Sequence, residues 1–177
     1  MSAILAFAGS NSSTSINYSL VKYTASLIEE HQVRLLNMVN YPFPMYSEDA
    51  EKEQGYSNAL KELYNDIQEV EGLIISVNEH NGGQSAYFKN LIDWLSRLDR
   101  GFIKESKIFL MSTSPGKRGA IGSHERTEKM LTRFGAEIIS TFSLPSFKDN
   151  FDSEKGITDK DLAEQHRQAL QHFLSKI

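Results

Sequence analysis

The chain has 177 residues and a formal net charge of −4; 40% of its residues are hydrophobic, 24% are charged and none is cysteine. This composition is that of a globular protein with one core, and it excludes disordered, collagen-like and coiled-coil proteins. The lack of cysteine excludes disulfides, thiolate metal sites and cysteine nucleophiles. No basic cluster indicates nucleic-acid binding, and no apolar run approaches the roughly 18 residues of a membrane span.

The first apolar run, Ala3–Ala8, begins almost at Met1 and could be mistaken for a signal peptide. It lacks the basic residues that open a signal peptide, and it is shorter than the usual apolar stretch of about 7–15 residues. We therefore interpret it as a buried strand. We expect a cytoplasmic protein, in which the Asn-x-Ser sequons at Asn11 and Asn17 carry no glycan.

Short apolar runs alternate with segments of helical period along the whole chain. Several runs are apolar at consecutive positions, as expected for strands covered on both faces. The predicted strands are Ala3–Ala8, Val33–Leu36, Leu73–Val77, Ile108–Met111 and Ile138–Ile139. The predicted helical segments are Leu20–Ile28, Ser57–Val70, Phe88–Leu98, Ser123–Phe134 and Leu162–Ile177.

Five alternations of strand and helix predict an α/β fold, in which a parallel sheet is covered by helices on both faces. Gly135 stands where a C-capping glycine is expected. The longest irregular segment is 38–56, and its acidic run Ser47–Glu53 is expected to be a solvated loop. No repeat or linker interrupts the chain, so we expect one domain over residues 1–177.

The loop after the first strand, Gly9–Asn17, has hydroxyl residues at five of the six positions 10–15. Ligands of open parallel sheets bind at the carboxyl ends of strands. The backbone N–H groups of such a loop, and of the helix that follows it, can bind a phosphate. The motifs of a P-loop and of a dinucleotide site are missing. Composition alone therefore leaves open a hydroxyl-rich turn that only caps the helix.

Three motifs resemble those of the NADPH-dependent FMN reductase family, whose members have a flavodoxin-like fold and include quinone, chromate and azo-dye reductases. The first is Gly-Ser-x-x-x-x-Ser-x-Asn at Gly9–Asn17. The second joins Asn78–Gly82 to Lys89–Arg97, and is similar to Pro-Glu-Tyr-Asn-Gly followed by Lys-Asn-x-Ile-Asp-Trp-x-Ser-Arg. The third is the glycine-bearing loop Ser112–Gly119, and Phe151–Asp159 echoes the segment before the last helix. The resemblance thus covers nearly the whole chain and implies the strand order 2-1-3-4-5.

The resemblance implies that the three loops hold FMN, with its phosphate in the first loop and its ring beside the other two. The implied cofactor-binding residues are Ser10, Ser12, Ser15, Ile16, Asn17, Asn78, Glu79, His80, Asn81, Gly82, Ser112, Thr113, Ser114 and Gly116. Gly116 and Gly119 permit close backbone approach and positive φ angles. Lys117 and Arg118 either meet the phosphates of a nicotinamide dinucleotide or are simply solvated.

Three positions depart from the family pattern: Ser12 replaces a usual Arg, Asn78 a frequent Pro and His80 a frequent Tyr. Loss of the guanidinium removes a charge-assisted hydrogen bond worth roughly 1.5–3 kcal/mol, which corresponds to about tenfold to a hundredfold in FMN affinity. The His80 imidazole can stack on the ring or donate to it. The alternative is a drifted loop residue that contacts no ligand.

The Lys89–Arg97 helix is the most specific part of the resemblance. We expect Trp94 to lie in the core or in a subunit contact, and Asp93 to pair with Arg97 four residues later. The five histidines are scattered, and neither a zinc motif nor a Gly-x-Ser-x-Gly elbow is present. We therefore expect no metal site.

The resemblance implies an FMN-dependent NAD(P)H oxidoreductase, which passes hydride from NADPH or NADH to the flavin and on to a small acceptor such as a quinone. The cofactor carries that chemistry, so no catalytic side chain is expected. The resemblance also implies a homodimer or homotetramer. Two alternatives stay open. One is a flavodoxin-like FMN electron carrier, and the other is a family member that has lost flavin and serves as a binding protein.

Overall fold

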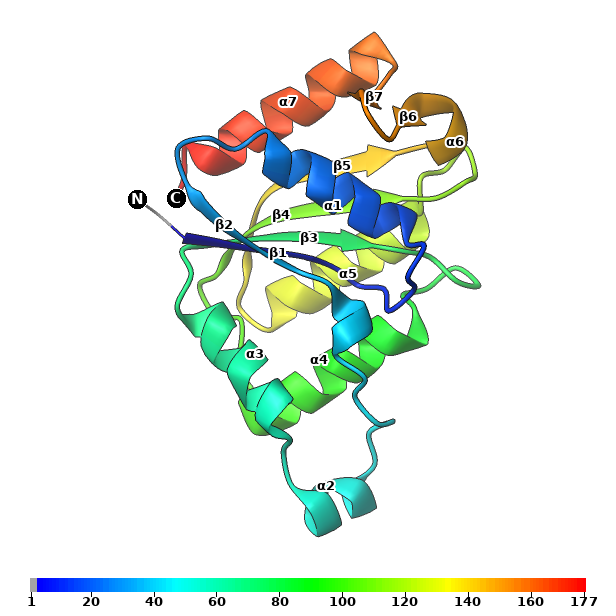
Figure 1. The fold of residues 1–177 in the computed structure, drawn as a ribbon. Coiled ribbons are helices and arrows are strands. Elements are labelled where there is room, and N and C mark those ends of the chain that lie inside the picture. Colours follow the sequence, from blue (N-terminus) through cyan, green and yellow to red (C-terminus); the bar gives the residue numbers. More distant parts are fainter. Residues whose placement is uncertain (1–2) are drawn as a thin grey trace.

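A computed structural model describes residues 3–177, so Met1 and Ser2 of the expected domain lie outside the described residues. Five strands form one parallel sheet in the order β2-β1-β3-β4-β5, as Figure 1 shows. The strands are β1 (Ala3–Ala8), β2 (Gln32–Leu36), β3 (Gly72–Val77), β4 (Lys107–Thr113) and β5 (Glu137–Leu144). The predicted fold class and strand order are confirmed.

Helices cover both faces of the sheet (Figure 1). One face packs against α1 (Ile16–Ser26) and α7 (Lys160–Leu174). The other face packs against α3 (Asn58–Gln68), α4 (Ala86–Leu98) and α5 (Ile121–Arg133). Because β1 is covered on both sides, its residues alternate between two core clusters and all of them can be apolar.

The last strand is longer than its apolar pair indicated, because β5 continues through Ser140, Thr141 and Ser143. It lies at an edge of the sheet, where polar residues are tolerated. Between β5 and α7 the chain forms α6 (Phe147–Asn150) and a small antiparallel hairpin of β6 (Phe151–Asp152) and β7 (Gly156–Ile157).

The expectation of a solvated loop at Ser47–Glu53 is wrong. The segment 38–56 contains a 3-10 turn, η1 (Met38–Asn40), and a projecting helix, α2 (Glu48–Gln54), seen at the bottom of Figure 1. Ser47 caps α2 by accepting a hydrogen bond from Ala50 N at 3.1 Å. The acidic residues lie in the first turn, where the helix dipole favours negative charge. The acidic run is therefore a helix start.

One stripe of α4 holds the 38–56 segment through hydrogen bonds. The Asn90 carboxamide accepts from Tyr46 N at 2.7 Å and donates to Pro44 O at 2.9 Å. The Trp94 indole N–H donates to the same carbonyl at 2.8 Å, and this side chain is buried in the core. The prediction of a core position for Trp94 is confirmed.

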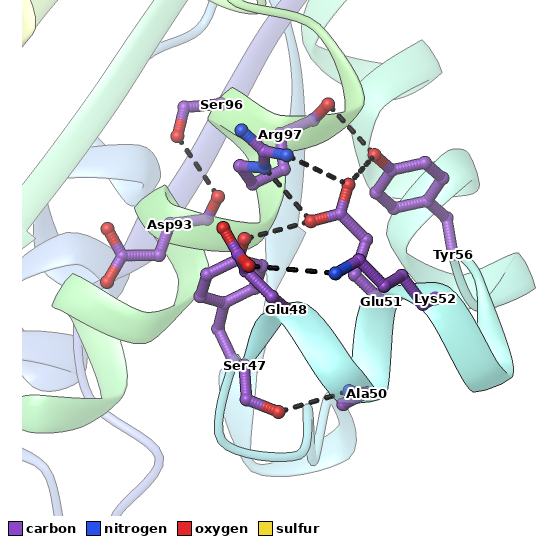
Figure 2. Close-up of polar contacts among 10 residues, drawn as sticks. Ser47, Glu48, Ala50, Glu51, Lys52, Tyr56, Asp93, Ser96 and Arg97 are labelled. Carbon is purple, nitrogen blue, oxygen red and sulfur yellow. Dashed lines mark hydrogen bonds and ion pairs between the residues drawn. The ribbon is translucent and has the colours of Figure 1, made fainter.

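The expected pair of Asp93 with Arg97 does not form. Instead, Arg97 donates to the Glu51 carboxylate at 2.9 Å, and two tyrosine hydroxyls donate to the same carboxylate at 2.8 Å; Figure 2 shows this cluster. These hydrogen bonds, led by that from Arg97, lower the pKa of Glu51 to about 2. Asp93 pairs with Lys89, one turn earlier on α4. The partner on α2 could not be foreseen without the fold.

None of the helices within residues 3–177 combines the length and apolar character needed to cross a bilayer.

Candidate functional site

Three loops meet at the carboxyl edge of the sheet, where they follow the adjacent strands β1, β3 and β4. They enclose a cavity of about 210 Å³. Its lining includes ten predicted site residues: Ser10, Ser12, Ser15, Ile16, Asn17, Asn78, Glu79, His80, Thr113 and Ser114. Four predicted residues, Asn81, Gly82, Ser112 and Gly116, do not line it, whereas Thr14 and Pro115 line it without having been predicted.

Size alone would select a different cavity, of about 520 Å³, formed by the segment after α1 and the last turns of α7. This cavity lies near the amino-terminal edge of the sheet, because α1 leads back to the start of β2. Its lining residues are mostly apolar or of mixed charge, and none belongs to the three loops. Position in the fold therefore favours the smaller cavity.

The first loop, Ser10–Ser15, folds around its own hydroxyl oxygens. Ser10 Oγ accepts from Ser12 N and Ser12 Oγ accepts from Thr14 N, each at 3.3 Å. Ser15 caps α1 by accepting from Tyr18 N at 3.2 Å. The Ser12 and Thr14 side chains are exposed and their hydroxyl oxygens lie 3.3 Å apart, so one of the two hydroxyl protons stays available to a ligand.

The first turn of α1 presents N–H groups to the same cavity. Within residues 3–177 no acceptor bonds the backbone N–H of Ile16 or Asn17. Such N–H groups and the helix dipole favour an anion. The Asn17 side chain itself is buried and ties α1 to the sheet, since its Oδ1 accepts from Ser76 Oγ at 2.7 Å and from Thr113 N at 3.1 Å. Of the groups of Asn17, therefore, only the backbone N–H can bind a ligand.

The second loop is a tight two-residue turn. His80 and Gly83 exchange backbone hydrogen bonds of 2.9 and 3.1 Å. Asn81 and Gly82 between them both have positive φ, 52° and 74°, which is the type I′ geometry that Asn-Gly favours. Asn78 Nδ2 lies 3.1 Å from His80 Nε2, while Asn78 Oδ1 is buried and has no partner within residues 3–177. The second loop therefore keeps one hydrogen-bond acceptor that no group within residues 3–177 satisfies.

Most polar side chains of the third loop bind the protein rather than the cavity. Ser112 Oγ donates to Gly119 O and Thr113 Oγ1 donates to Leu144 O, each at 2.8 Å. Gly119 uses the conformational freedom of glycine, with a positive φ of 56°, whereas Gly116 does not. A Cβ at Gly119 would overlap Ser143 Oγ, whereas a Cβ at Gly116 would have only Ser114 Oγ within 4 Å, at 3.8 Å.

A serine–histidine pair lies behind this loop, with His124 Nδ1 3.0 Å from Ser112 Oγ. Both residues are buried, and burial lowers the pKa of His124. Because the hydroxyl already binds Gly119 O and cannot be reached, the pair has a structural role. Among the described residues, no group of three histidine or acidic side chains could hold a metal ion.

The cavity fits a phosphate ester on the chemistry of its donors. Hydroxyls at positions 10, 12 and 14 and the free N–H groups at 16 and 17 converge on it. No lysine or arginine is among its lining residues, so neutral donors and the helix dipole would have to hold a phosphate dianion. FMN carries such a phosphate, and the residues present fit it.

A doubly wound five-stranded sheet defines a protein of the flavodoxin-like class when its first strand is followed by an anion-binding loop. Here that loop and the N–H groups of Ile16 and Asn17 form the cradle at the start of α1. Residues 2–149 match the family model of the NADPH-dependent FMN reductases. The chain therefore belongs to the NADPH-dependent FMN reductase family. As a member of this family it is an oxidoreductase with FMN as cofactor and NAD(P)H as reductant, which confirms the resemblance seen in the motifs.

Relatives of known sequence or structure are consistent with this assignment. The chain is 29% identical to an uncharacterised protein of Mycoplasma pneumoniae, over 84% of this chain and 90% of that protein. It is 26% identical to a quinone reductase of Escherichia coli K12, over 55% of this chain and 52% of the relative. In structure it is similar to the NAD(P)H:(acceptor) oxidoreductase FerB of Paracoccus denitrificans, with a TM-score of 0.80, 21% identity and coverage of 99% and 96%. At that identity the structural likeness supports the fold alone.

Proposed function

We propose that the protein passes hydride from NADPH or NADH to FMN held in the three-loop cavity, and electrons from there to a small acceptor such as a quinone. The observation that carries the proposal is the cradle at the start of α1, where exposed hydroxyls and two unpaired N–H groups line one cavity. The quinone acceptor is suggested by the partial match to a bacterial quinone reductase. Residues 1–177 would then form one FMN-binding domain.

In this proposal the first loop binds the phosphate and the other two loops border the ring. Ser10, Ser12 and Ser15 shape the first loop, while the Ile16 and Asn17 N–H groups supply charge-assisted hydrogen bonds. Bound FMN supplies hydride and electron transfer. The chain's own residues bind and orient it and exclude water; no side chain is required to move a proton.

At the ring end, backbone groups would make most of the contacts. The side chains of Ser112 and Thr113 have protein partners, and both residues belong to β4, where Asn17 also bonds the Thr113 backbone. The N–H groups of Ser114 and Gly116, which have no acceptor within residues 3–177, remain for the ligand. In the second loop the turn at Asn81 and Gly82 presents its backbone in a fixed conformation. Asn78 and His80 lie at the cavity wall.

Steady-state turnover tests the proposal. We expect FMN-loaded protein to oxidise NADPH or NADH faster when a quinone is added, at a rate that depends on bound FMN. FMN binding without nicotinamide oxidation would instead identify an electron carrier, and absence of FMN binding would identify a binding protein. Either outcome contradicts the proposed reductase.

The Ser12→Arg variant tests the departure in the first loop. A guanidinium there would add a charge-assisted hydrogen bond to the phosphate, and we expect FMN to bind about tenfold to a hundredfold more tightly. Ser12→Gln, which adds length without charge, is the matched control. Equal affinity of the Arg variant and the wild type would show that the phosphate does not lie beside position 12.

We also propose that the protein is cytoplasmic and forms a homodimer or homotetramer. Support for the assembly comes from the family. On the projecting segment before α2, Met45 is 70% exposed, which is unusual for a large apolar side chain. Sedimentation velocity of the FMN-loaded protein tests the assembly: a monomer at all concentrations would contradict it.

A further inference from the structure

Helix α5 begins without a capping side chain of its own. Its N-cap residue is Ala120, which has a left-handed φ of 64° and no side-chain oxygen to offer. The preceding residue, Gly119, also has a positive φ of 56°. The N–H groups in the first turn of such a helix need acceptors from elsewhere.

The missing cap comes from the second loop of the cavity. Glu79 Oε2 accepts a hydrogen bond from Ser123 N at 2.8 Å, and Ser123 Oγ donates to Asn78 O at 2.7 Å. Glu79 thus caps α5 from more than forty residues away in sequence, and the Ser123 hydroxyl adds a second hydrogen bond to the same loop. The Glu79 carboxylate also meets the positive end of the helix dipole.

Gly122 makes room for this contact. A Cβ on Gly122 would lie 3.0 Å from Glu79 Oε2, which is tighter than most side-chain contacts, and at an ordinary contact distance of 3.5 Å from its Cδ. The sequence Gly122-Ser123 thus provides the space for the carboxylate and the backbone N–H from which it accepts. Two independent features of the α5 start therefore match Glu79.

The third loop is anchored at the same helix start. Gly119 O accepts hydrogen bonds from Ser112 Oγ at 2.8 Å and from Ser143 Oγ at 2.9 Å. The loops after β3 and β4 therefore both end on the first turn of α5, one through Glu79 and Ser123 and the other through Gly119. Their spacing depends on these two attachments.

We propose that Glu79 is a positioning residue that clamps the second loop to the start of α5 and so sets the width of the cofactor cavity. Family resemblance implied a cofactor contact for this residue, but its carboxylate is bonded to α5 instead. Its effect on the cofactor is therefore indirect, through the position of Asn78 and His80. This inference rests on the proposed FMN site.

Hydrogen exchange of the flavin-free protein tests the clamp without any cofactor. Glu79→Ala is expected to raise exchange at the Ser123 amide and in residues 78–83, while α7 keeps its wild-type protection. Glu79→Gln keeps an oxygen acceptor and is expected to restore most of the protection at Ser123. Glu128→Ala, which removes a carboxylate one turn further along α5, is the matched control. Unchanged exchange at Ser123 in Glu79→Ala overturns the clamp.

FMN titration of the same variants tests the consequence for the cavity. We expect Glu79→Ala to weaken FMN binding by about tenfold, and Glu79→Gln and Glu128→Ala to stay within about threefold of wild type. Gly122→Ala is expected to weaken binding less than Glu79→Ala, because its methyl group displaces the carboxylate without removing it. Wild-type affinity in Glu79→Ala overturns the positioning role. If the wild type itself binds no FMN, the proposed function fails, while the exchange data still decide the clamp.

Discussion

The first loop and the α4 stripe are both rich in polar groups, but they use them in opposite ways. Along α4, the Asn90 and Trp94 side chains bond to the backbone of the 38–56 segment, and Arg97 bonds to Glu51. In the first loop, the Ser12 hydroxyl is exposed, and within residues 3–177 the N–H groups of Ile16 and Asn17 have no acceptor. The satisfied groups stabilise the fold, whereas the unsatisfied groups are available to a ligand.

This contrast predicts that variants separate into two classes. Changes along the α4 stripe should alter the free energy of unfolding and leave FMN affinity unchanged. Changes in the first loop should alter FMN affinity and leave the free energy of unfolding unchanged. A variant that changes both the free energy of unfolding and FMN affinity would contradict this separation into two classes.

Trp94→Ala is expected to have the largest effect. It removes a buried indole and its hydrogen bond to Pro44 O, and it should lower the free energy of unfolding by about 3–5 kcal/mol. Urea unfolding measures this change, with Trp94→Phe as a smaller substitution that keeps most of the apolar volume. A loss below about 1 kcal/mol in Trp94→Ala would show that the stripe does not hold the segment.

Acidification should destabilise the opposite face of the sheet. His166 is buried among aromatic rings under α7, with Thr24 Oγ1 2.8 Å from its Nε2, and burial lowers the pKa of His166 to about 4. Its pKa in the unfolded chain is about 6.5, so the unfolded state takes up the proton first as the pH falls. The contribution of His166 to the free energy of unfolding should therefore be constant above about pH 6.5 and decline by about 3 kcal/mol down to pH 4.

Unfolding free energies measured between pH 7 and 4 test this decline. His166→Phe fills a similar volume and leaves Thr24 its hydrogen bond to Leu20 O, so its stability should depend less on pH. His124, whose pKa is also lowered by burial, contributes to the loss of stability at low pH. Because His124 remains in the variant, His166→Phe should keep that part of the pH dependence. Identical pH profiles for the wild type and His166→Phe would contradict the assignment to His166.

Ile16→Pro tests the first loop with little effect on the fold. Proline is well tolerated at the first position of a helix, but it removes the N–H that faces the cavity. We expect FMN binding to weaken by about tenfold to a hundredfold, while Ile16→Ala, which keeps the N–H, binds normally. Equal affinities of the two variants would show that this N–H does not meet the phosphate.

The smallest effect is expected at Gly116. Its backbone is not left-handed and its Cβ position is open, so Gly116→Ala should change stability by less than about 0.5 kcal/mol. Gly119→Ala should destabilise more, because Gly119 needs a positive φ and has Ser143 against it. Thermal melts measure the stability of the two variants. An equal loss of stability in Gly116→Ala and Gly119→Ala would contradict this difference.

The sequence predicted the fold well because each buried strand carries its signal in consecutive apolar residues. The strand Ala3–Ala8 was predicted with its observed bounds, whereas β5 was recognised only at Ile138–Ile139 because polar residues fill the rest of this edge strand. The acidic helix α2 was missed because its stabilising partner, Arg97, is distant in sequence.

Ten of the candidate site residues line one cavity, but their roles could not be predicted from the sequence. The prediction that the three loops lie at one edge of the sheet is confirmed, because the carboxyl ends of parallel strands lie at the same edge. The sequence could not show that the Asn17 and Thr113 side chains bond to the protein, or that Glu79 bonds to α5. Those roles depend on partners brought together only by folding.

Equilibrium titration of the purified protein with FMN, followed by flavin fluorescence and visible absorbance, tests the central claim most directly. The cradle at the start of α1 predicts saturable binding of one FMN per chain at micromolar or tighter affinity, with a weaker value in Ile16→Pro. Absence of binding at tens of micromolar FMN would contradict the account, because hydroxyls and helix N–H groups would then be insufficient without the cation that Ser12 replaces.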